Sequence, residues 1–207
     1  ISTPVTSTKH LSERLSYESG YFSHTKKKNE KAEAKIKEKV MDCHYDEGYA
    51  FLRELEKRVE HPIIFPSDLT PARQEWEQAH FQALWLSIIS EKATEVHMNK
   101  DWEYSNGCAE EFTHVMQLRL GLPINDSIFF YNTKEDSEAA RRRMRNIRVY
   151  NHTGQAISLE DGLYSIEKAS EWIKEHGFKT PKLDNCQTLL VETDKMLEKG
   201  FYQKGLF

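Results

Sequence analysis

The segment from Asp101 to Glu111 combines residue types that can hold an anion and act on it. A Ser-Asn-Gly turn at 105–107 stands directly before an expected helix. Backbone N–H groups that have no partner at the start of a helix form a natural seat for phosphate or another anion. Glu111 follows Gly107 by four residues, so we expect its carboxylate in the first helical turn, facing the same seat. An anion seat beside a carboxylate indicates chemistry on a nucleotide-like ligand.

The elements that position this segment alternate between strand and helix. Apolar periodicity and turn residues predict strands within 1–8 and over 61–66, 93–99 and 128–131, with helices over 27–59, 71–91 and 108–120. Such alternation is typical of an α/β fold, a parallel sheet flanked by helices. Ligands bind beyond the carboxyl ends of strands in such sheets. The loop after the first strand and the loop after residue 99 are therefore expected to face one crevice.

The pattern changes beyond residue 131. There the sequence predicts a helix over 134–146, a short hairpin over 148–158, and helices over 158–177 and 183–199. We therefore expect a nucleotide-binding core over 1–131, with a helical insertion at about 9–60. A mainly helical C-terminal extension over 132–207 would pack on this core.

Composition and charge narrow the classes of protein. The 207 residues carry a formal net charge of −4, which argues against nucleic acid or an anionic membrane as partner. No apolar run approaches the roughly 20 residues that span a bilayer. The cysteines Cys43, Cys108 and Cys186 and the nine histidines show no metal-ligand spacing. We expect a cytoplasmic protein with reduced thiols, no metal and no cofactor.

Two short motifs resemble a known family. Residues 1–6 are similar to the I-S-G-P-M-T start of nucleoside 2-deoxyribosyltransferase-like proteins, in particular of a small branch near the nucleoside 5'-monophosphate N-glycosidases. That branch also carries a W-x-x-S-x-G-x-x-x-E segment, followed by G-x-P. The matching residues here are Trp102, Ser105, Gly107, Glu111, Gly121 and Pro123. The resemblance covers roughly residues 1–131 and is best at the two ends.

The resemblance implies a Rossmann-like (flavodoxin-like) sheet and an enzyme that cleaves N-glycosidic bonds. In the family the Glu attacks the anomeric carbon, and water or a second base then resolves the glycosyl-enzyme, which gives hydrolysis or base exchange. Glu111 would be this nucleophile. Ser105 stands where the 5'-monophosphate branch has a serine on the phosphate, so a nucleoside 5'-monophosphate or related nucleotide is the favoured substrate. The family also implies a homo-oligomer.

One family feature is missing from this chain. Family enzymes carry an Asp on the preceding helix, but here the equivalent stretch, 80–83, reads His-Phe-Gln-Ala. His80, Gln82 or Asp101 would have to replace it as general acid. The missing Asp favours one alternative function, a non-catalytic nucleotide-binding or sensor module. A NAD-type glycohydrolase, which also uses a lone Glu, is the other alternative.

The expected substrate-binding residues lie in the two motifs. They are Ser2, Thr3, Pro4, Thr6, Trp102, Tyr104, Ser105, Asn106 and Gly107. Purely structural roles stay open for several candidates: Glu111 as a carboxylate in the field of the helix dipole, Ser105 as a helix cap, Trp102 and Tyr104 as packing residues, and His80 as a structural histidine.

The densest positive cluster comprises Arg141, Arg142, Arg143, Arg145 and Arg148. Acidic residues precede it at 135–138, and such mixed charge is typical of a solvated helix face. We therefore favour a solvated helix, or one that contacts another subunit, over phosphate or RNA binding.

Overall fold

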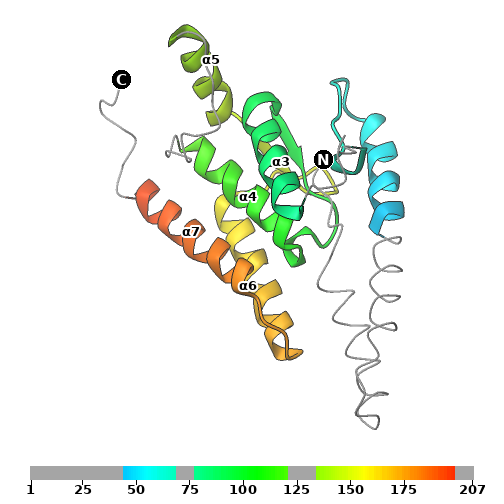
Figure 1. Ribbon diagram of the computed structural model, residues 1–207, viewed down its shortest axis with the longest axis vertical. Helices are drawn as coiled ribbons and strands as arrows, with labels where there is room; N and C mark the ends of the chain where they lie inside the picture. The colour runs from blue at the N-terminus through cyan, green and yellow to red at the C-terminus, as the bar shows by residue number, and fades with distance from the viewer. Residues whose placement is uncertain (1–43, 69–76, 121–133, 199–207) are drawn as a thin grey trace.

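The computed structural model describes residues 44–68, 77–120 and 134–198 (Figure 1). The predictions for the first strand, the first part of the helix over 27–59, the helix start at Thr70–Pro71 and the strand over 128–131 lie outside these residues. So do the candidate residues Ser2, Thr3, Pro4 and Thr6. The described part is mostly helical around a small parallel sheet, an arrangement compatible with the expected α/β class.

The sheet pairs two short strands, β1 (Glu95–His97) and β2 (Arg148–Tyr150), in parallel. The paired residues are Glu95 and Arg148, Val96 and Val149, and His97 and Tyr150. Val96 and Val149 are buried, while Glu95 and Arg148 form an ion pair on the other face. This confirms the strand expected over 93–99 in its central residues. The sequence predicts only a hairpin over 148–158, so the parallel pairing of β2 with β1 is an addition that the structure makes.

A tight turn follows β2. The side-chain oxygen of Asn151 accepts hydrogen bonds from the backbone N–H groups of Thr153 (3.0 Å) and Gln155 (2.9 Å). Gly154 adopts a left-handed φ of 89°, which a glycine tolerates without strain. The chain then returns through a single antiparallel bridge between Tyr150 and Ala156. The expected hairpin is therefore confirmed in its turn, with a minimal ladder.

Helices make up most of the described chain. The labelled ones are α3 (Gln78–Lys92), α4 (Asn106–Arg119), α5 (Lys134–Arg145), α6 (Leu159–Glu175) and α7 (Pro181–Glu198), with 3-10 turns η1 (Pro66–Asp68) and η2 (Trp102–Tyr104). Residues 44–56 are also helical. Ser158 begins α6 through a capping box with Asp161, each side chain bonding the other's backbone N–H.

One predicted element is wrong, and another begins later in the described residues than predicted. Residues 61–65 form no strand, and Pro66 opens a 3-10 turn. The prolines at 62 and 66 bring no N–H donor to a ladder, so this apolar run is buried at Phe65 without sheet pairing. The helix expected over 71–91 is confirmed from Gln78 on, as α3, and Glu77 before it is extended (φ −78°, ψ 159°).

Helix α4 lies at the centre of the main hydrophobic core (Figure 1). Helix α7 packs against both α4 and α6, and α3 and α5 also contact α4. Gly162 of α6 lies so close to α4 that a Cβ built on it would be 2.0 Å from Cζ of Phe112. The core thus joins residues on both sides of position 131.

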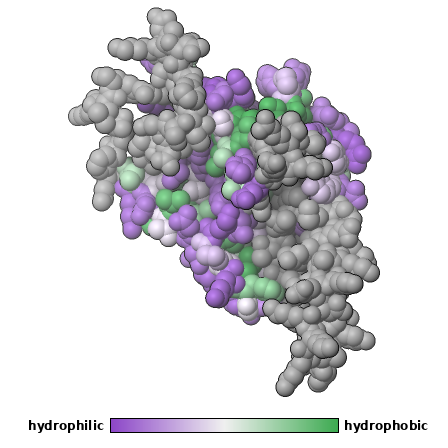
Figure 2. Space-filling model, in the orientation of Figure 1, coloured by the Kyte–Doolittle hydropathy of each residue, from purple (hydrophilic) through white to green (hydrophobic). Residues whose placement is uncertain are grey.

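A second, smaller core lies under the helix at 44–56. Phe51, Leu55 and Phe65 form it, and Tyr49 contacts the Phe65 ring edge-on at 4.9 Å. Where the described residues are visible in Figure 2, the surface is mainly hydrophilic, with smaller apolar areas. None of the helices described here has the length and apolar content to cross a membrane.

Candidate functional site

Helix α4 begins at the serine of the predicted anion seat. Ser105 is the N-cap: its Oγ accepts a hydrogen bond from the N–H of Cys108 (3.5 Å), and its carbonyl accepts one from Ala109 (2.9 Å). The residue is buried, at 3% exposure. The interpretation of Ser105 as a cap is therefore confirmed. A hydroxyl that accepts one hydrogen bond still has its own O–H to donate, so capping leaves Ser105 able to bond a ligand oxygen.

The expectation that Glu111 lies in the first helical turn is wrong. The helix begins at Asn106, two residues earlier than predicted, and its first turn contains no acidic residue. Glu111 therefore lies one turn further along. It is 6% exposed, and among the described residues it is the one buried carboxylate. Carboxylates are seldom buried in folded proteins, and a buried one is normally hydrogen-bonded or paired.

The adjacent carboxylate points elsewhere. Glu110 forms an ion pair with Lys182 of α7, at 3.0 Å between Oε1 and Nζ. Successive residues on an α-helix are rotated by about 100°, so neighbours face different surroundings. Glu110 serves the contact between helices and is a natural control for Glu111.

Helix α3 contributes Gln82 to the start of α4. Its Nε2 donates to the carbonyl of Gly107 at 3.4 Å, and a methyl group on Gly107 would lie 3.4 Å from its Oε1. An amide has no acidic proton, so Gln82 can position a ligand but cannot act as general acid. His80 is exposed, and its Nδ1 accepts a hydrogen bond from the N–H of Glu77 (3.1 Å), which caps α3. Proton donation by His80 would therefore have to come from Nε2.

The aromatic residues of the motif pack against the core. Trp102 is 5% exposed, and its ring lies 4.9 Å from that of Phe112. Tyr104 contacts the Trp172 ring edge-on at 5.7 Å. These contacts support packing roles for both. Asp101 adopts a left-handed conformation (φ 57°) that turns the chain into η2, a conformation in which Asp is enriched.

A hollow of about 540 Å³ opens beyond the carboxyl ends of β1 and β2. Asn99 and Lys100, which follow β1, line it together with His152, which follows β2. The other lining residues are Glu47, Ala50, Phe51, Glu54 and Arg58. This edge of a parallel sheet is where ligands bind in α/β proteins, and the volume suits a small molecule.

We did not single out these residues from the sequence. The available signal was the position of Asn99 and Lys100 at the end of the predicted strand. The helix at 44–56 and the turn at His152 come from distant parts of the chain. Arg58 joins them by donating to the carbonyl of His152 at 3.5 Å.

The comparisons with known proteins add nothing to this geometry. No protein family, no curated protein and no solved structure matches the chain. Its function is therefore inferred from its residues and their arrangement.

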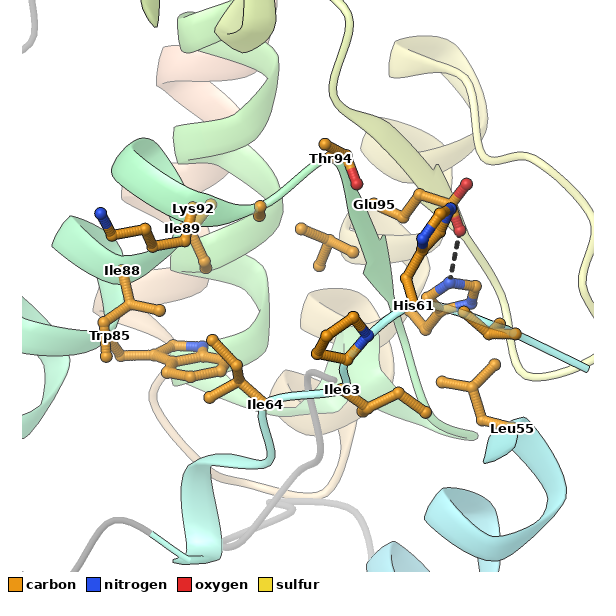
Figure 3. A pocket seen from close by; sticks show the side chains of 15 residues that line it. Leu55, His61, Ile63, Ile64, Trp85, Ile88, Ile89, Lys92, Thr94 and Glu95 are labelled. Atoms are coloured by element: carbon orange, nitrogen blue, oxygen red, sulfur yellow. Dashed lines mark hydrogen bonds and ion pairs between the residues drawn. The ribbon is translucent and has the colours of Figure 1, made fainter. Parts of the chain in front are cut away.

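A small cavity of about 110 Å³ lies between α3, β1 and the segment at 61–64 (Figure 3). Trp85, Ile63 and Ile64 line it with apolar surface, and Glu95 bonds Nε2 of His97 at 3.0 Å on its polar side. Ligand pockets usually measure about 300–1,000 Å³. This cavity is too small for a nucleotide.

Other reactive groups in the described residues are buried in structural positions. Cys108 and Cys186 are buried thiols. Burial raises the pKa of Cys186 to about 11, so this thiol stays protonated and unreactive at neutral pH. His114 is buried beside Ser90, with 2.7 Å between Nε2 and Oγ. Across the described ranges, no three His, Cys, Asp or Glu side chains group as metal ligands.

Proposed function

We propose that the protein cleaves the N-glycosidic bond of a nucleoside 5'-monophosphate or a related nucleotide, with Glu111 as nucleophile on a Rossmann-like core. The observation that carries the proposal is the burial of Glu111 on a helix that starts just after the β1 loop. A carboxylate shielded from water interacts more strongly with the positive charge that develops on the sugar. The motif resemblance at residues 1–6 and 102–111 supports the same assignment.

In the proposed reaction an oxygen of Glu111 forms a bond to the anomeric carbon, and the bond from that carbon to the base nitrogen breaks. The bonding electron pair leaves with the base, which takes up a proton. Water then attacks the glycosyl ester, which returns the free carboxylate and releases the sugar phosphate. Asp101 or Nε2 of His80 would supply the proton. A second base in place of water would give base exchange.

The start of α4 would hold the phosphate. The backbone N–H groups of Asn106 and Gly107 and the hydroxyl of Ser105 provide donors at the positive end of the helix dipole. Residues 2–6 would form the facing wall of the crevice. By the same resemblance we expect a homo-oligomer, and the cysteine usage favours a cytoplasmic location.

Non-catalytic nucleotide binding is the second candidate function. The side chain of α3 that contacts the start of α4 is the amide of Gln82, where catalysis would call for an acid. A protein of this kind would bind nucleotides and release no base. The experiment below separates the two candidates.

Glu111→Gln is expected to lower the rate of base release by on the order of 10³-fold or more, because an amide cannot act as the nucleophile. The protein would be incubated with nucleosides, nucleoside 5'-monophosphates and NAD, and free base measured by chromatography. Glu110→Gln is the matched control on the same helix, and it should keep activity within a few-fold. Equal rates for wild type and Glu111→Gln would exclude Glu111 as nucleophile. Nucleotide binding with no base release would favour the non-catalytic candidate.

Ser105→Ala is expected to lower the free energy of unfolding by about 1 kcal/mol, because it removes an N-cap. Ser158→Ala, which removes the N-cap of α6, should destabilise by a similar amount. Only Ser105→Ala should also raise KM for 5'-monophosphates, with little change for the free nucleosides. An unchanged KM for 5'-monophosphates would show that Ser105 acts only as a helix cap and does not bind the phosphate.

A further inference from the structure

Four arginine side chains line one hollow at the opposite edge of the sheet. We call it the arginine hollow. Arg119 comes from the end of α4, Arg143 and Arg145 from the last turn of α5, and Arg148 from the first residue of β2. The other lining residues are Thr94, Asn146 and Ile147. None of the described residues that line it is a carboxylate, and its volume is about 470 Å³. Thr94 precedes β1, so the hollow lies at the amino ends of the strands, away from the hollow at Asn99.

The arginines are held in place by different means. Arg143 donates to the carbonyls of Ser90 (2.5 Å) and Ala93 (3.3 Å) at the end of α3. Arg148 is paired with Glu95 across the strands. These contacts fix the two guanidinium groups at the wall of the hollow. Fixed groups lose little further side-chain entropy when a ligand binds, which favours affinity.

Arg119 adds a positive charge to the hollow, and no carboxylate of the described residues forms an ion pair with it. It is exposed, and Nη1 lies 3.7 Å from Sδ of Met116, a weak acceptor. Arg142 of α5, which is outside the hollow, instead pairs with Glu138 at 2.7 Å. The chain as a whole is negative, at −4, so this concentration of positive charge does not follow from bulk composition.

Stabilisation of helix ends explains only part of the cluster. Basic residues in the last turns of α4 and α5 interact favourably with the helix dipoles. Arg148 lies on a strand and has no such role. Dipole compensation also does not require side chains from three elements to meet around one concavity.

We propose that the arginine hollow binds the linked phosphates of a small anionic ligand, such as a di- or triphosphate group. Guanidinium groups bond phosphate oxygens in a bidentate manner, and several of them match a chain of linked phosphates. The volume lies within the range of small-molecule sites, while the negative net charge disfavours a long nucleic acid. This inference does not rest on the proposed function, because the site is a different one.

The test is a calorimetric titration of the full chain with inorganic triphosphate, at low salt and at 0.15 M salt. Triphosphate should bind wild type and Arg142→Gln alike, within about twofold. The double variant Arg119→Gln/Arg145→Gln should bind at least about tenfold more weakly, because it loses two charge-assisted contacts. Both substitutions avoid Arg143, which holds the end of α3. Circular dichroism checks that each variant is folded.

Two further titrations identify which kind of phosphate compound the hollow prefers. Inorganic phosphate should bind more weakly than triphosphate, and a short single-stranded oligonucleotide should not bind more tightly than triphosphate. No binding of triphosphate to wild type would overturn the proposal. The proposal would also fail if Arg142→Gln weakened triphosphate binding as much as the double variant does. Such a result would indicate attraction by general surface charge only. Tighter binding of the oligonucleotide than of triphosphate would also overturn the proposal, because it would mean that the hollow binds nucleic acid and not a small ligand.

Discussion

Gly162→Ala is expected to lower the free energy of unfolding by about 3 kcal/mol, because the new methyl group has no room. A Cβ at this position would lie 2.0 Å from Cζ and 2.2 Å from Cε1 of Phe112. Phe112 is fully buried at the centre of the main core, so its ring has little space to turn aside. Either α4 and α6 move apart or Phe112 leaves its rotamer. Alanine's better helix propensity, worth up to about 1 kcal/mol, does not offset this clash.

Urea denaturation measures the effect, and Gly107→Ala is the matched control. It makes the same change near the start of a helix, where the nearest contact would be Oε1 of Gln82 at 3.4 Å. Its stability should change by less than about 1 kcal/mol. Phe112→Leu should relieve part of the clash when it is added to Gly162→Ala, with an interaction free energy of opposite sign to the single effects. Equal urea midpoints for wild type and Gly162→Ala would contradict this close approach.

His114 is expected to make the protein less stable as the pH falls from about 6.5 to about 4. Burial lowers the pKa of this imidazole from 6.5 to about 4. Between these pH values His114 is protonated in the unfolded chain but stays neutral in the folded chain. The free energy of unfolding therefore falls as the pH falls. The full loss is about 3 kcal/mol, complete near pH 4, and the stabilisation is fully present above pH 6.5.

His114→Gln should flatten this part of the stability profile. The amide can still bond Ser90, whose Oγ lies 2.7 Å from Nε2 in the wild type, but it does not titrate. The measurement is urea unfolding at pH values from 7.5 to 4. Burial also lowers the pKa of His97, so some acid sensitivity should persist in the variant. The interpretation fails if the variant and the wild type lose stability in parallel.

The helices were predictable from local chemistry. Ser158 and Asp161 form the capping box at the start of α6, and Gly177, with φ 83°, follows its end. These capping residues lie within a few positions of the helix ends that they determine. The ends can therefore be predicted from the sequence alone. The predicted start of α4 lies two residues late, about half a turn, which was enough to move Glu111 from the first turn into the second.

The sheet and the hollows were harder to predict because they depend on residues far apart in the chain. Strand β2 has three residues, too few for a pattern that names its partner. The apolar run at 61–66 looked more like a strand than β2 does, yet it forms none. Arg119 and Arg148 meet around one hollow only after α4 and β2 are in place. Arg148 belongs to the positive cluster seen in the sequence, but nothing in the sequence places Arg119 beside it.

The order of synthesis matters for the β1–β2 pair. Glu95 and Arg148 are 53 positions apart, so β1 leaves the ribosome long before its partner strand exists. Helices α3 and α4 need only local hydrogen bonds and can form in the meantime. Until Arg148 emerges, the edge of β1 that will accept β2 offers its backbone groups to any other extended chain. Nascent chains stalled before this point are therefore the form of the protein most exposed to wrong strand pairing and aggregation.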